Sequence, residues 1–413
     1  MAPKSPHRAV HSRSDVPLSG ASGSPIPIGL LVVVAALTAI GLACVWVAVQ
    51  GDSDYSFNRQ VLGVGLGVVC MVVLWLVDYR SLSKAVWVLL ALDVVLVLLP
   101  MVPGLGVERG GATSWVSLAG VTFQPSEFAK PVTILMVSAA CARYGGRITR
   151  GADYAKVLAL VLVPFLLLFT EDLGTALVIL IFGFFILFVA GASLKWLSVT
   201  LCALVAVVVG AIGLNGVVST WTGGAVTLVE DYQMSRLLVF IDSDNPDYAD
   251  DAYNLTQAEI AVGSGEVYGK GFGNAAQSSG GFLPEPATDF IFCVFAEQFG
   301  FVGCLVLLAL YLALLASALA IGRSTGDLFG TLICVGVMGM WLFQIVENIG
   351  MDIGLMPITG IPLPFMSYGS SFMVTNFVCV GLLCSVWARR GDVLGKTRKK
   401  MQGTVRLDVK SVN

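Results

Sequence analysis

The residues of this sequence best placed for chemistry surround Asp289, in the stretch LPEPATDFIF at positions 283–292. Asp289 directly precedes a long apolar run, so its carboxylate is either a helix cap or a base at the edge of a membrane. The side chains of Thr288 and Asp289 can both accept hydrogen bonds from backbone N–H groups at the start of a helix. Glu285 and two prolines in the approach favour the other interpretation, in which Asp289 accepts a proton as a general base.

A second carboxylate, Glu297, lies within the apolar run that follows Asp289. Eight helical residues separate the two groups by about 12 Å. This distance is too long for two carboxylates to share one proton. Asp289 is therefore expected to act alone or with a partner from another part of the chain.

The stretch FQPSEFAK (123–130) opens another apolar run and places Glu127 and Lys130 three residues apart. On a helix the two side chains lie on one face and can pair. Such a pair either makes a polar helix end tolerable or lines a cavity, because charges inside membrane segments are costly and usually face a substrate path. The sequence leaves both roles open.

Two further polar stretches interrupt the apolar runs. Glu171 and Asp172 are expected to cap the helix that follows them, Glu171 more so than Asp172. The segment 347–371 carries two acids, three prolines and several glycines, and irregular backbone at membrane depth must be buried in protein or line a cavity. We expect it to form one wall of a pocket. Asp93 receives no role.

Histidine and cysteine chemistry is excluded from the body of the protein. The two histidines, His7 and His11, both lie in the polar N-terminal stretch. The nine cysteines fall within or next to apolar segments and form no CxxC pair, so neither a disulfide framework nor a zinc site is indicated.

The composition is that of a membrane protein. Of 413 residues, 56% are hydrophobic and only 12% are charged, and several apolar runs exceed the roughly 20 residues that cross a bilayer as a helix. The predicted fold is an all-α integral membrane protein with ten transmembrane helices. They are expected at about 27–50, 60–77, 82–102, 124–142, 155–170, 172–193, 195–215, 289–321, 328–349 and 369–388.

Basic residues accumulate on the side of the predicted membrane that carries both chain ends, so both termini are predicted to be cytoplasmic. The predicted organisation is a cytoplasmic tail (1–25), a membrane domain (26–390) and a basic cytoplasmic tail (391–413). A large extracellular loop (216–288) joins helices seven and eight. Counting Asp289, it holds eleven acidic residues, and its stretch NLTQAEIAVGSG predicts a short amphipathic helix on the membrane face.

The eighth predicted helix is too long for a simple crossing. About 32 residues separate Asp289 from Arg323, or roughly 48 Å against a hydrocarbon core of about 30 Å. The helix must tilt strongly, kink near Gly300–Gly303, or project from the membrane with Asp289 at its outer end.

Six stretches occur in an order and spacing that resemble the SEDS family (shape, elongation, division and sporulation), the RodA and FtsW group. They are GATSWVSLAGVTFQPSEFAK, EDLGTA, AEIAVGSGEVYGKGFGNAAQ, LPEPATDFIF, AEQFGFVG and GLMPITGIPLPFMSYGSS. The resemblance covers nearly the whole membrane region, and NIGMDIGLMPITGIPLPF is more similar to the RodA elongation branch than to the FtsW division branch.

The resemblance implies a peptidoglycan glycosyltransferase of the bacterial plasma membrane. Such enzymes polymerise lipid II, a disaccharide-pentapeptide on undecaprenyl pyrophosphate, beside a class B penicillin-binding protein that crosslinks the glycan. The essential aspartate of the family falls on Asp289. No metal site or organic cofactor is implied, although a divalent cation is possible, and the partners are membrane lipid and protein rather than nucleic acid. The candidate substrate-binding residues are Arg109, Glu127, Lys130, Asp172, Arg236, Gln257, Lys270, Glu285, Thr288, Glu297 and Ser367.

The sequence departs from the family pattern at four positions near these motifs. Ala287 stands where the family often has His, TED replaces a common Gln-Pro-Asp, Asp352 replaces Asn, and Ser370 replaces a second Gly. Three alternatives to an elongation polymerase stay open: a division-type polymerase, a lipid II flippase, and a non-catalytic scaffold.

Overall fold

Ten helices among the described residues coincide, within a few residues, with the ten predicted membrane segments. The computed structural model describes residues 26–50, 55–109, 112–118, 121–169, 171–221, 234–236, 239, 249–274, 277, 282–283 and 285–391. The ten helices are α1 (Ile28–Ala48), α2 (Phe57–Leu76), α3 (Val86–Leu98), α4 (Pro125–Ala142), α5 (Gly151–Leu168), α6 (Leu173–Val189), α7 (Leu194–Trp221), α11 (Ile291–Ser324), α12 (Leu328–Asp352) and α13 (Ser370–Ala388).

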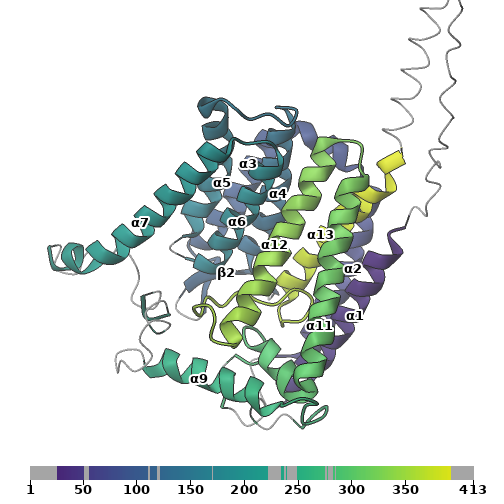
Figure 1. Ribbon diagram of the computed structural model, residues 1–413, viewed down its shortest axis with the longest axis vertical. Helices are drawn as coiled ribbons and strands as arrows, with labels where there is room; N and C mark the ends of the chain where they lie inside the picture. Colours follow the sequence, from purple (N-terminus) through teal and green to yellow (C-terminus); the bar gives the residue numbers. More distant parts are fainter. Residues whose placement is uncertain are drawn as a thin grey trace, which may run out of the picture.

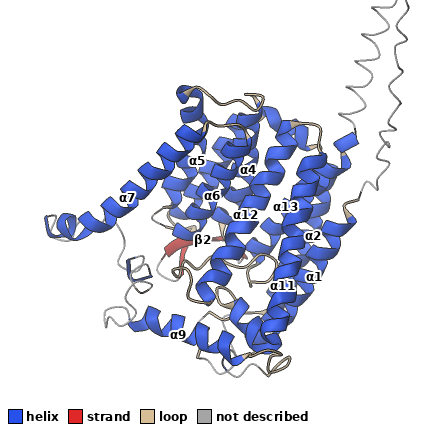
Figure 2. Ribbon diagram, viewed as in Figure 1, coloured by secondary structure: helices blue, strands red, loops and turns tan. Residues whose placement is uncertain are grey.

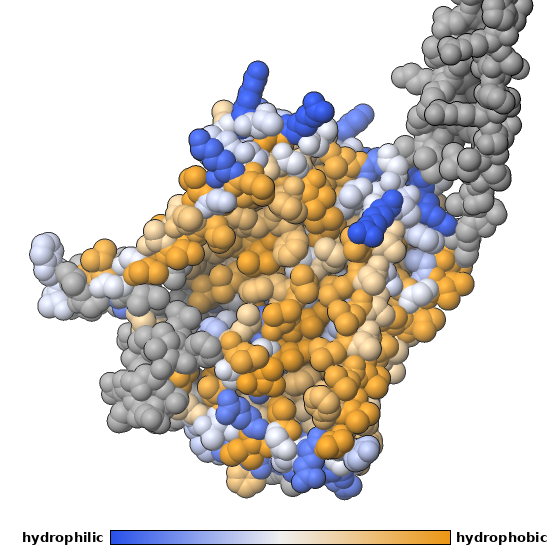
Figure 3. All heavy atoms as spheres, in the orientation of Figure 1, coloured by the Kyte–Doolittle hydropathy of each residue, from blue (hydrophilic) through white to orange (hydrophobic). Residues whose placement is uncertain are grey.

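Length and composition make this a multi-pass membrane protein. Six described helices are long and apolar enough to cross a membrane, namely α1, α2, α5, α11, α12 and α13, and shorter apolar helices accompany them. Apolar side chains cover the middle of the molecule, and hydrophilic side chains gather at its two ends (Figure 3). The all-α membrane fold is confirmed, whereas a crossing by all ten helices stays a prediction.

The helices pack side by side, and α4, α12 and α13 form the centre of the bundle (Figure 1). The packed neighbours include α2 with α13, α6 with α12, and α1 with α11. Helix α7 is different, because it extends away from the bundle (Figure 1). It also continues to Trp221, so the first residues of the predicted 216–288 loop are helical.

A small sheet that the sequence did not predict follows α3 and precedes α4 in the chain, and Figure 2 shows it in red. Its strands are β1 (Gly106–Arg109), β2 (Ala112–Leu118) and β3 (Val121–Phe123), paired antiparallel in the order β1-β2-β3. The strands are short, and three strands are needed before such a unit is stable. The sheet ends directly before α4 and fixes where that helix begins. At the other end of α3, a 3-10 helix, η1 (Tyr79–Lys84), precedes α3 in the chain.

The predicted kink in the eighth membrane segment is confirmed at Gly300, whose φ of 63° and ψ of −167° interrupt α11. The break leaves carbonyl groups in the preceding turn without helical partners. Two main-chain N–H groups satisfy them: Lys270 donates to Glu297 at 3.0 Å and Gly271 donates to Gln298 at 3.0 Å. The kink therefore joins α11 to the segment 265–274.

Only glycine fits at the closest point of this junction. A Cβ on Gly300 would lie 2.3 Å from the main-chain nitrogen of Gly269. The segment continues from α9 (Ala249–Ser264), which contains most of the predicted amphipathic stretch and is confirmed as a helix. Helix α9 runs beneath the lower ends of α11 and α12 in Figure 1. The first, buried part of α11 is thus enclosed from this side.

Candidate active site

Asp289 lies in the turn immediately before α11, and neither it nor Thr288 caps that helix. The N-cap residue is Phe290, which makes no side-chain cap hydrogen bond. The Thr288 hydroxyl instead donates to the main-chain oxygen of Glu285 at 3.3 Å. The expectation that Thr288 or Asp289 caps the helix is wrong, because the chain makes one further turn before the helix starts.

The backbone of residues 287–289 is held by three hydrogen bonds from other elements. The three carbonyl oxygens accept, in order, from the main-chain N–H of Tyr368 at 2.7 Å, the hydroxyl of Ser367 at 2.6 Å and the side-chain amide of Asn348 at 2.6 Å. Ser367, a predicted substrate-binding residue, is fully buried and supports this turn. The Asp289 carboxylate is not used in holding its own backbone.

The Asp289 carboxylate faces Gly360 and Arg236. A Cβ placed on Gly360 would lie 3.1 Å from Asp289 Oδ2 and 3.5 Å from Arg236 Nη1. Both charged groups therefore lie within 3.5 Å of one point, and an opposite charge this near favours the ionised carboxylate. The glycine leaves room for the two side chains to approach each other.

Burial nevertheless raises the pKa of Asp289 to about 7, and the negative charge of Glu285 contributes to this rise. The Arg236 charge and the hydrogen bond from Thr288 act in the opposite direction. A carboxyl group with this pKa changes protonation near neutral pH, the range in which a general base is most effective. Glu285 itself accepts a hydrogen bond from the Tyr55 hydroxyl, and its carboxylate lies 3.3 Å from the Thr288 hydroxyl oxygen.

We expect Gly360→Ala to lower the activity of this site about tenfold with little loss of folded protein. The added methyl would contact Asp289 Oδ2 and displace it from Arg236, and a φ of +71° adds strain of about 1 kcal/mol for a residue other than glycine. The measurement is the initial rate of the lipid II polymerisation that the family resemblance implies, together with thermal stability. Gly104→Ala is the matched control, since Gly104 also has a left-handed φ of +85° but no atom within 4 Å of its Cβ. Equal losses in both variants would show that backbone strain alone is responsible.

Asp172 organises the neighbouring side of the site. It caps α6 by accepting from the main-chain N–H of Thr175 at 2.9 Å, so the expected preference for Glu171 as the cap is wrong. Its other oxygen accepts from Gln124 Nε2 at 3.0 Å and Ser126 Oγ at 3.1 Å. Asp172 therefore ties the start of α6 to the start of α4.

The predicted pair of Glu127 and Lys130 is confirmed, with 2.7 Å between Lys130 Nζ and Glu127 Oε1. Both side chains are buried, at 3% and 1% exposure. The Lys130 ammonium also lies over the ring of Phe372, 5.4 Å from its centroid. Asp172 is near enough to interact electrostatically with both Glu127 and Asp289. Arg236, Asp289, Asp172 and the pair of Glu127 and Lys130 therefore follow one another within electrostatic range.

The predicted irregular wall of the pocket begins later than expected. Helix α12 continues to Asp352, and irregular backbone follows over residues 353–369. Glu347 and Asp352 are buried on α12, and both interact electrostatically with Asp289. The Glu347 carboxylate accepts a hydrogen bond from the Thr359 hydroxyl, next to Gly360. The wall is therefore anchored to α12 beside the candidate base.

Three other predicted site residues have different surroundings. Lys270 Nζ lies 2.6 Å from Glu297 Oε1, and the buried Glu297 carboxylate also accepts from the main-chain N–H of Gln277 at 2.9 Å. Gln257 on α9 accepts from Gln277 Nε2 at 2.5 Å. These contacts join α9 to the start of α11. Arg109 belongs to β1, and its side chain lies outside the described part of the structure.

Sequence reasoning missed Gly360, Asn348 and Tyr55 as parts of this site. A polar amide inside an apolar helix was the available signal for Asn348, since such groups usually face the protein interior. Nothing in the sequence placed Tyr55 beside Glu285, because 230 residues separate them.

No protein-held metal centre is present among the described residues, where no group of three His, Cys, Asp or Glu side chains is placed to hold an ion. The divalent cation that the resemblance leaves possible is therefore given no site among these residues.

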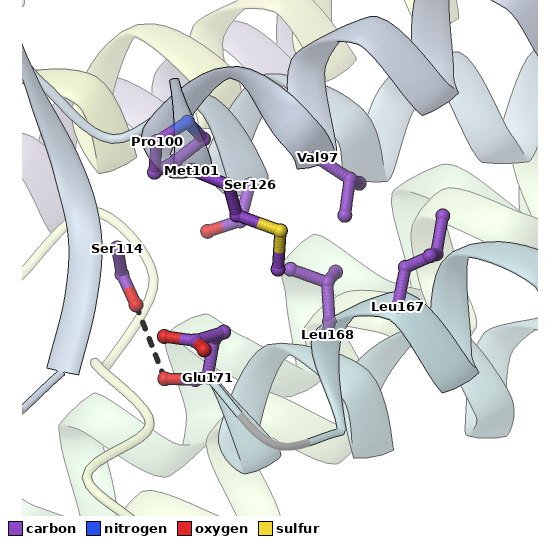
Figure 4. Close-up of a pocket in the computed structure, with 8 residues that line it drawn as sticks. All are labelled: Val97, Pro100, Met101, Ser114, Ser126, Leu167, Leu168 and Glu171. Carbon is purple, nitrogen blue, oxygen red and sulfur yellow. Dashed lines mark hydrogen bonds between the residues drawn. The ribbon is translucent and has the colours of Figure 1, made fainter. Parts of the chain in front are cut away.

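A small cavity behind Ser126 is too small for a lipid-linked sugar (Figure 4). Its volume of about 10 Å³ admits roughly one water molecule. The Ser114 hydroxyl donates to the main-chain oxygen of Glu171 at 3.1 Å along one side of it. Any large substrate must approach Asp289 elsewhere. The lining residues are Val97, Pro100, Met101, Ser114, Ser126, Leu167, Leu168 and Glu171.

Comparison with known proteins finds relatives that match most of this chain. Stage V sporulation protein E of Bacillus subtilis (strain 168) is 34% identical over 373 residues, covering 86% of this chain and 95% of that protein. Peptidoglycan glycosyltransferase MrdB of Escherichia coli (strain K12) is 33% identical over 365 residues, covering 87% and 93%.

Solved structures agree with these sequence matches. A chain from a structure described as "Structural coordination of polymerization and crosslinking by a peptidoglycan synthase complex" matches with a TM-score of 0.71 and 31% identity, covering 88% of this chain and 98% of that one. The rod shape determining protein RodA of Thermus thermophilus matches with a TM-score of 0.63 and 30% identity, covering 88% and 96%. The FtsW/RodA/SpoVE family profile, described as cell cycle protein, matches residues 26–391. The chain therefore belongs to the FtsW/RodA/SpoVE family of membrane proteins, the SEDS family.

Proposed function

We propose that this protein is a peptidoglycan glycosyltransferase that polymerises lipid II, with Asp289 as the general base. The observation that supports this most strongly is the geometry around Asp289. Three hydrogen bonds from other elements fix its backbone, while its carboxylate faces Arg236 across Gly360. These hydrogen bonds use main-chain oxygens only, so the carboxylate is held in place and stays available to accept a proton.

In the proposed reaction Asp289 accepts the proton of the 4-hydroxyl on the acceptor sugar. The hydroxyl oxygen then bonds to the anomeric carbon of the donor, whose bond to the pyrophosphate oxygen breaks with both electrons leaving on undecaprenyl pyrophosphate. Because the leaving group is already a stable anion, one base suffices and no second carboxylate acts as a nucleophile. A single displacement converts the α-linked donor into a β-linked strand.

Cationic side chains would balance the charge of the departing pyrophosphate. Arg236 is the nearest candidate, since its guanidinium lies beside the Asp289 carboxylate. Lys130 is the second candidate, although Glu127 already neutralises part of its charge. In this proposal the pyrophosphate competes with Glu127 for the Lys130 ammonium.

We expect the polymerisation rate to rise with pH through the pKa of Asp289, which is about 7. The ionised carboxylate is the active form, and its share increases from about a tenth at pH 6 to about nine-tenths at pH 8. The measurement is kcat/KM for lipid II between pH 5.5 and 8.5, because this quantity reports ionisation in the free protein. A value of kcat/KM that does not change with pH over this range would contradict an Asp289 base with a pKa of about 7.

The same proposal includes the orientation and the partner. The predicted cytoplasmic termini, with tails at 1–25 and 391–413 around the membrane domain 26–390, put the loop 216–288 and Asp289 on the outer face. The partner would be a class B penicillin-binding protein, which agrees with the solved synthase complex that coordinates polymerisation and crosslinking. An elongation role is proposed from the RodA-like sequence of residues 348–365.

A lipid II flippase is the second candidate, because buried charges such as Glu127 and Lys130 also suit a transport path. The test uses purified protein with its cognate transpeptidase in liposomes that contain fluorescent lipid II. We expect glycan strands and released undecaprenyl pyrophosphate. Movement of lipid II between leaflets without any strand would favour the flippase and reject the polymerase.

A further inference from the structure

A hollow at the end of the molecule opposite Asp289 has the properties of an anion-binding site. It has a volume of about 450 Å³, is open to the surface, and lies between η1 and the last turn of α4. This is the end where α3 begins and α4 ends, the upper end in Figure 1. The lining residues are Ser83, Lys84, Ala139, Ala142 and Arg143.

The two cations in this hollow differ from the basic residues around them in the described part of the structure. Lys84 and Arg143 are both exposed, and within the described residues neither has an ion-pair partner. The other basic residues nearby behave differently: Arg80 pairs with Asp327, and Arg389 pairs with Asp78. Among the described residues, two positive charges without an ion-pair partner therefore lie on one concave surface.

The rest of the lining is small and leaves the space between the charges open. Ala139 and Ala142 provide only methyl groups, and no carboxylate is among the lining residues. The Ser83 hydroxyl donates to the main-chain oxygen of Arg80 at 2.7 Å. The ammonium of Lys84 and the guanidinium of Arg143 are therefore the donors that a ligand would meet.

Exposed apolar side chains begin three residues after Lys84, one of the residues that line the hollow. Lys84 ends η1, and α3 begins two residues later. Trp87 and Val88 in the first turn of α3 are 73% and 69% exposed, as expected for side chains that contact lipid. Tryptophan is enriched at the level of the headgroups. A phosphate in this hollow would thus have acyl chains beside it.

We propose that this hollow binds the phosphate of an anionic phospholipid headgroup through Lys84 and Arg143, with the acyl chains lying along Trp87 and Val88. Basic pockets between membrane helices bind such headgroups by charge and hydrogen bonding. The apolar surface next to the hollow favours a lipid over free phosphate as the source of the anion. The site is independent of Asp289 and of the proposed reaction.

The test measures lipid retention by native mass spectrometry of the purified full-length protein in detergent. The protein is titrated with phosphatidylglycerol, with phosphatidylcholine, or with phosphatidylglycerol in the presence of millimolar inorganic phosphate. The variant Lys84→Ala/Arg143→Ala removes both donors. The control Arg150→Ala/Lys156→Ala removes the same net charge from exposed residues at the start of α5.

We expect the wild type and the control to retain one phosphatidylglycerol in preference to phosphatidylcholine. In the Lys84→Ala/Arg143→Ala variant, the affinity for phosphatidylglycerol should fall by at least about tenfold. Equal losses in the test and control variants, or equal retention of both lipids by the wild type, would overturn the site. Displacement of phosphatidylglycerol by millimolar phosphate would overturn its assignment to a lipid.

Discussion

Asp289→Asn is expected to reduce lipid II polymerisation by about a hundredfold to ten-thousandfold, the range that general base catalysis contributes. The amide has nearly the same shape as the carboxylate but cannot accept the proton of the acceptor hydroxyl. The Asp289 carbonyl would still accept its hydrogen bond from Asn348, so the turn should stay in place. The measurement is strand formation by purified protein in complex with its transpeptidase.

Two controls separate catalysis from folding for Asp289→Asn. Membrane insertion and complex formation should match the wild type, because the substitution leaves the backbone contacts of residues 287–289 intact. Asp153→Asn removes a carboxylate at the opposite end of the molecule, beside Lys156, and should polymerise normally. Full polymerisation by Asp289→Asn would end the proposal of this residue as the base.

Lys130→Met is expected to cause the second large effect, on stability as well as activity. The substitution leaves the Glu127 carboxylate buried without its partner, and breaking a buried ion pair in this way costs about 3–5 kcal/mol. Polymerisation should fall by about a hundredfold if Lys130 also meets the pyrophosphate. Thermal unfolding in detergent and the rate of strand formation measure the two effects separately.

The double variant Glu127→Gln/Lys130→Met distinguishes a structural role of Lys130 from a role in substrate binding. Removing both charges leaves no unpaired ion, so the lost stability should largely return. We expect the rate to stay low, because the cation is still missing. Recovery of both stability and rate would make Glu127 and Lys130 a purely structural pair.

The hydropathy of the chain predicted the helices well, because the bilayer imposes a length and a composition on each. The kink at Gly300 followed from the same argument, since 32 residues do not fit a single crossing. The pair of Glu127 and Lys130 followed from helical spacing alone. These features depend on local sequence or on the membrane as a solvent.

The features that the sequence did not predict depend on contacts between distant segments. The sheet β1–β3 is stabilised by pairing of short strands, none of which is strongly patterned by itself. Asp172 rather than Glu171 caps α6 because Gln124 and Ser126 also hold its carboxylate. Gly360 reaches Asp289 only through the path of the irregular segment 353–369. Such choices are decided by the packed structure.

Several predicted site residues form groups that the linear sequence does not suggest. The side chains of Asp289 and Arg236 both lie next to Gly360, whereas Lys270 pairs with Glu297. The latter pair connects the segment after α9 to the start of α11, on which Asp289 depends for its position. We therefore interpret Lys270 and Glu297 as support for the site and Arg236 as its nearest cation.

The stereochemistry of the new glycosidic bond tests most directly whether Asp289 acts as a single base in one displacement. Isotopically labelled lipid II is polymerised by the wild-type complex, and the anomeric configuration of the product is determined by NMR. A β-linked strand is the predicted result, because one displacement inverts the α-linked donor. An α-linked strand would require two displacements through a covalent intermediate and would contradict the proposed role of Asp289.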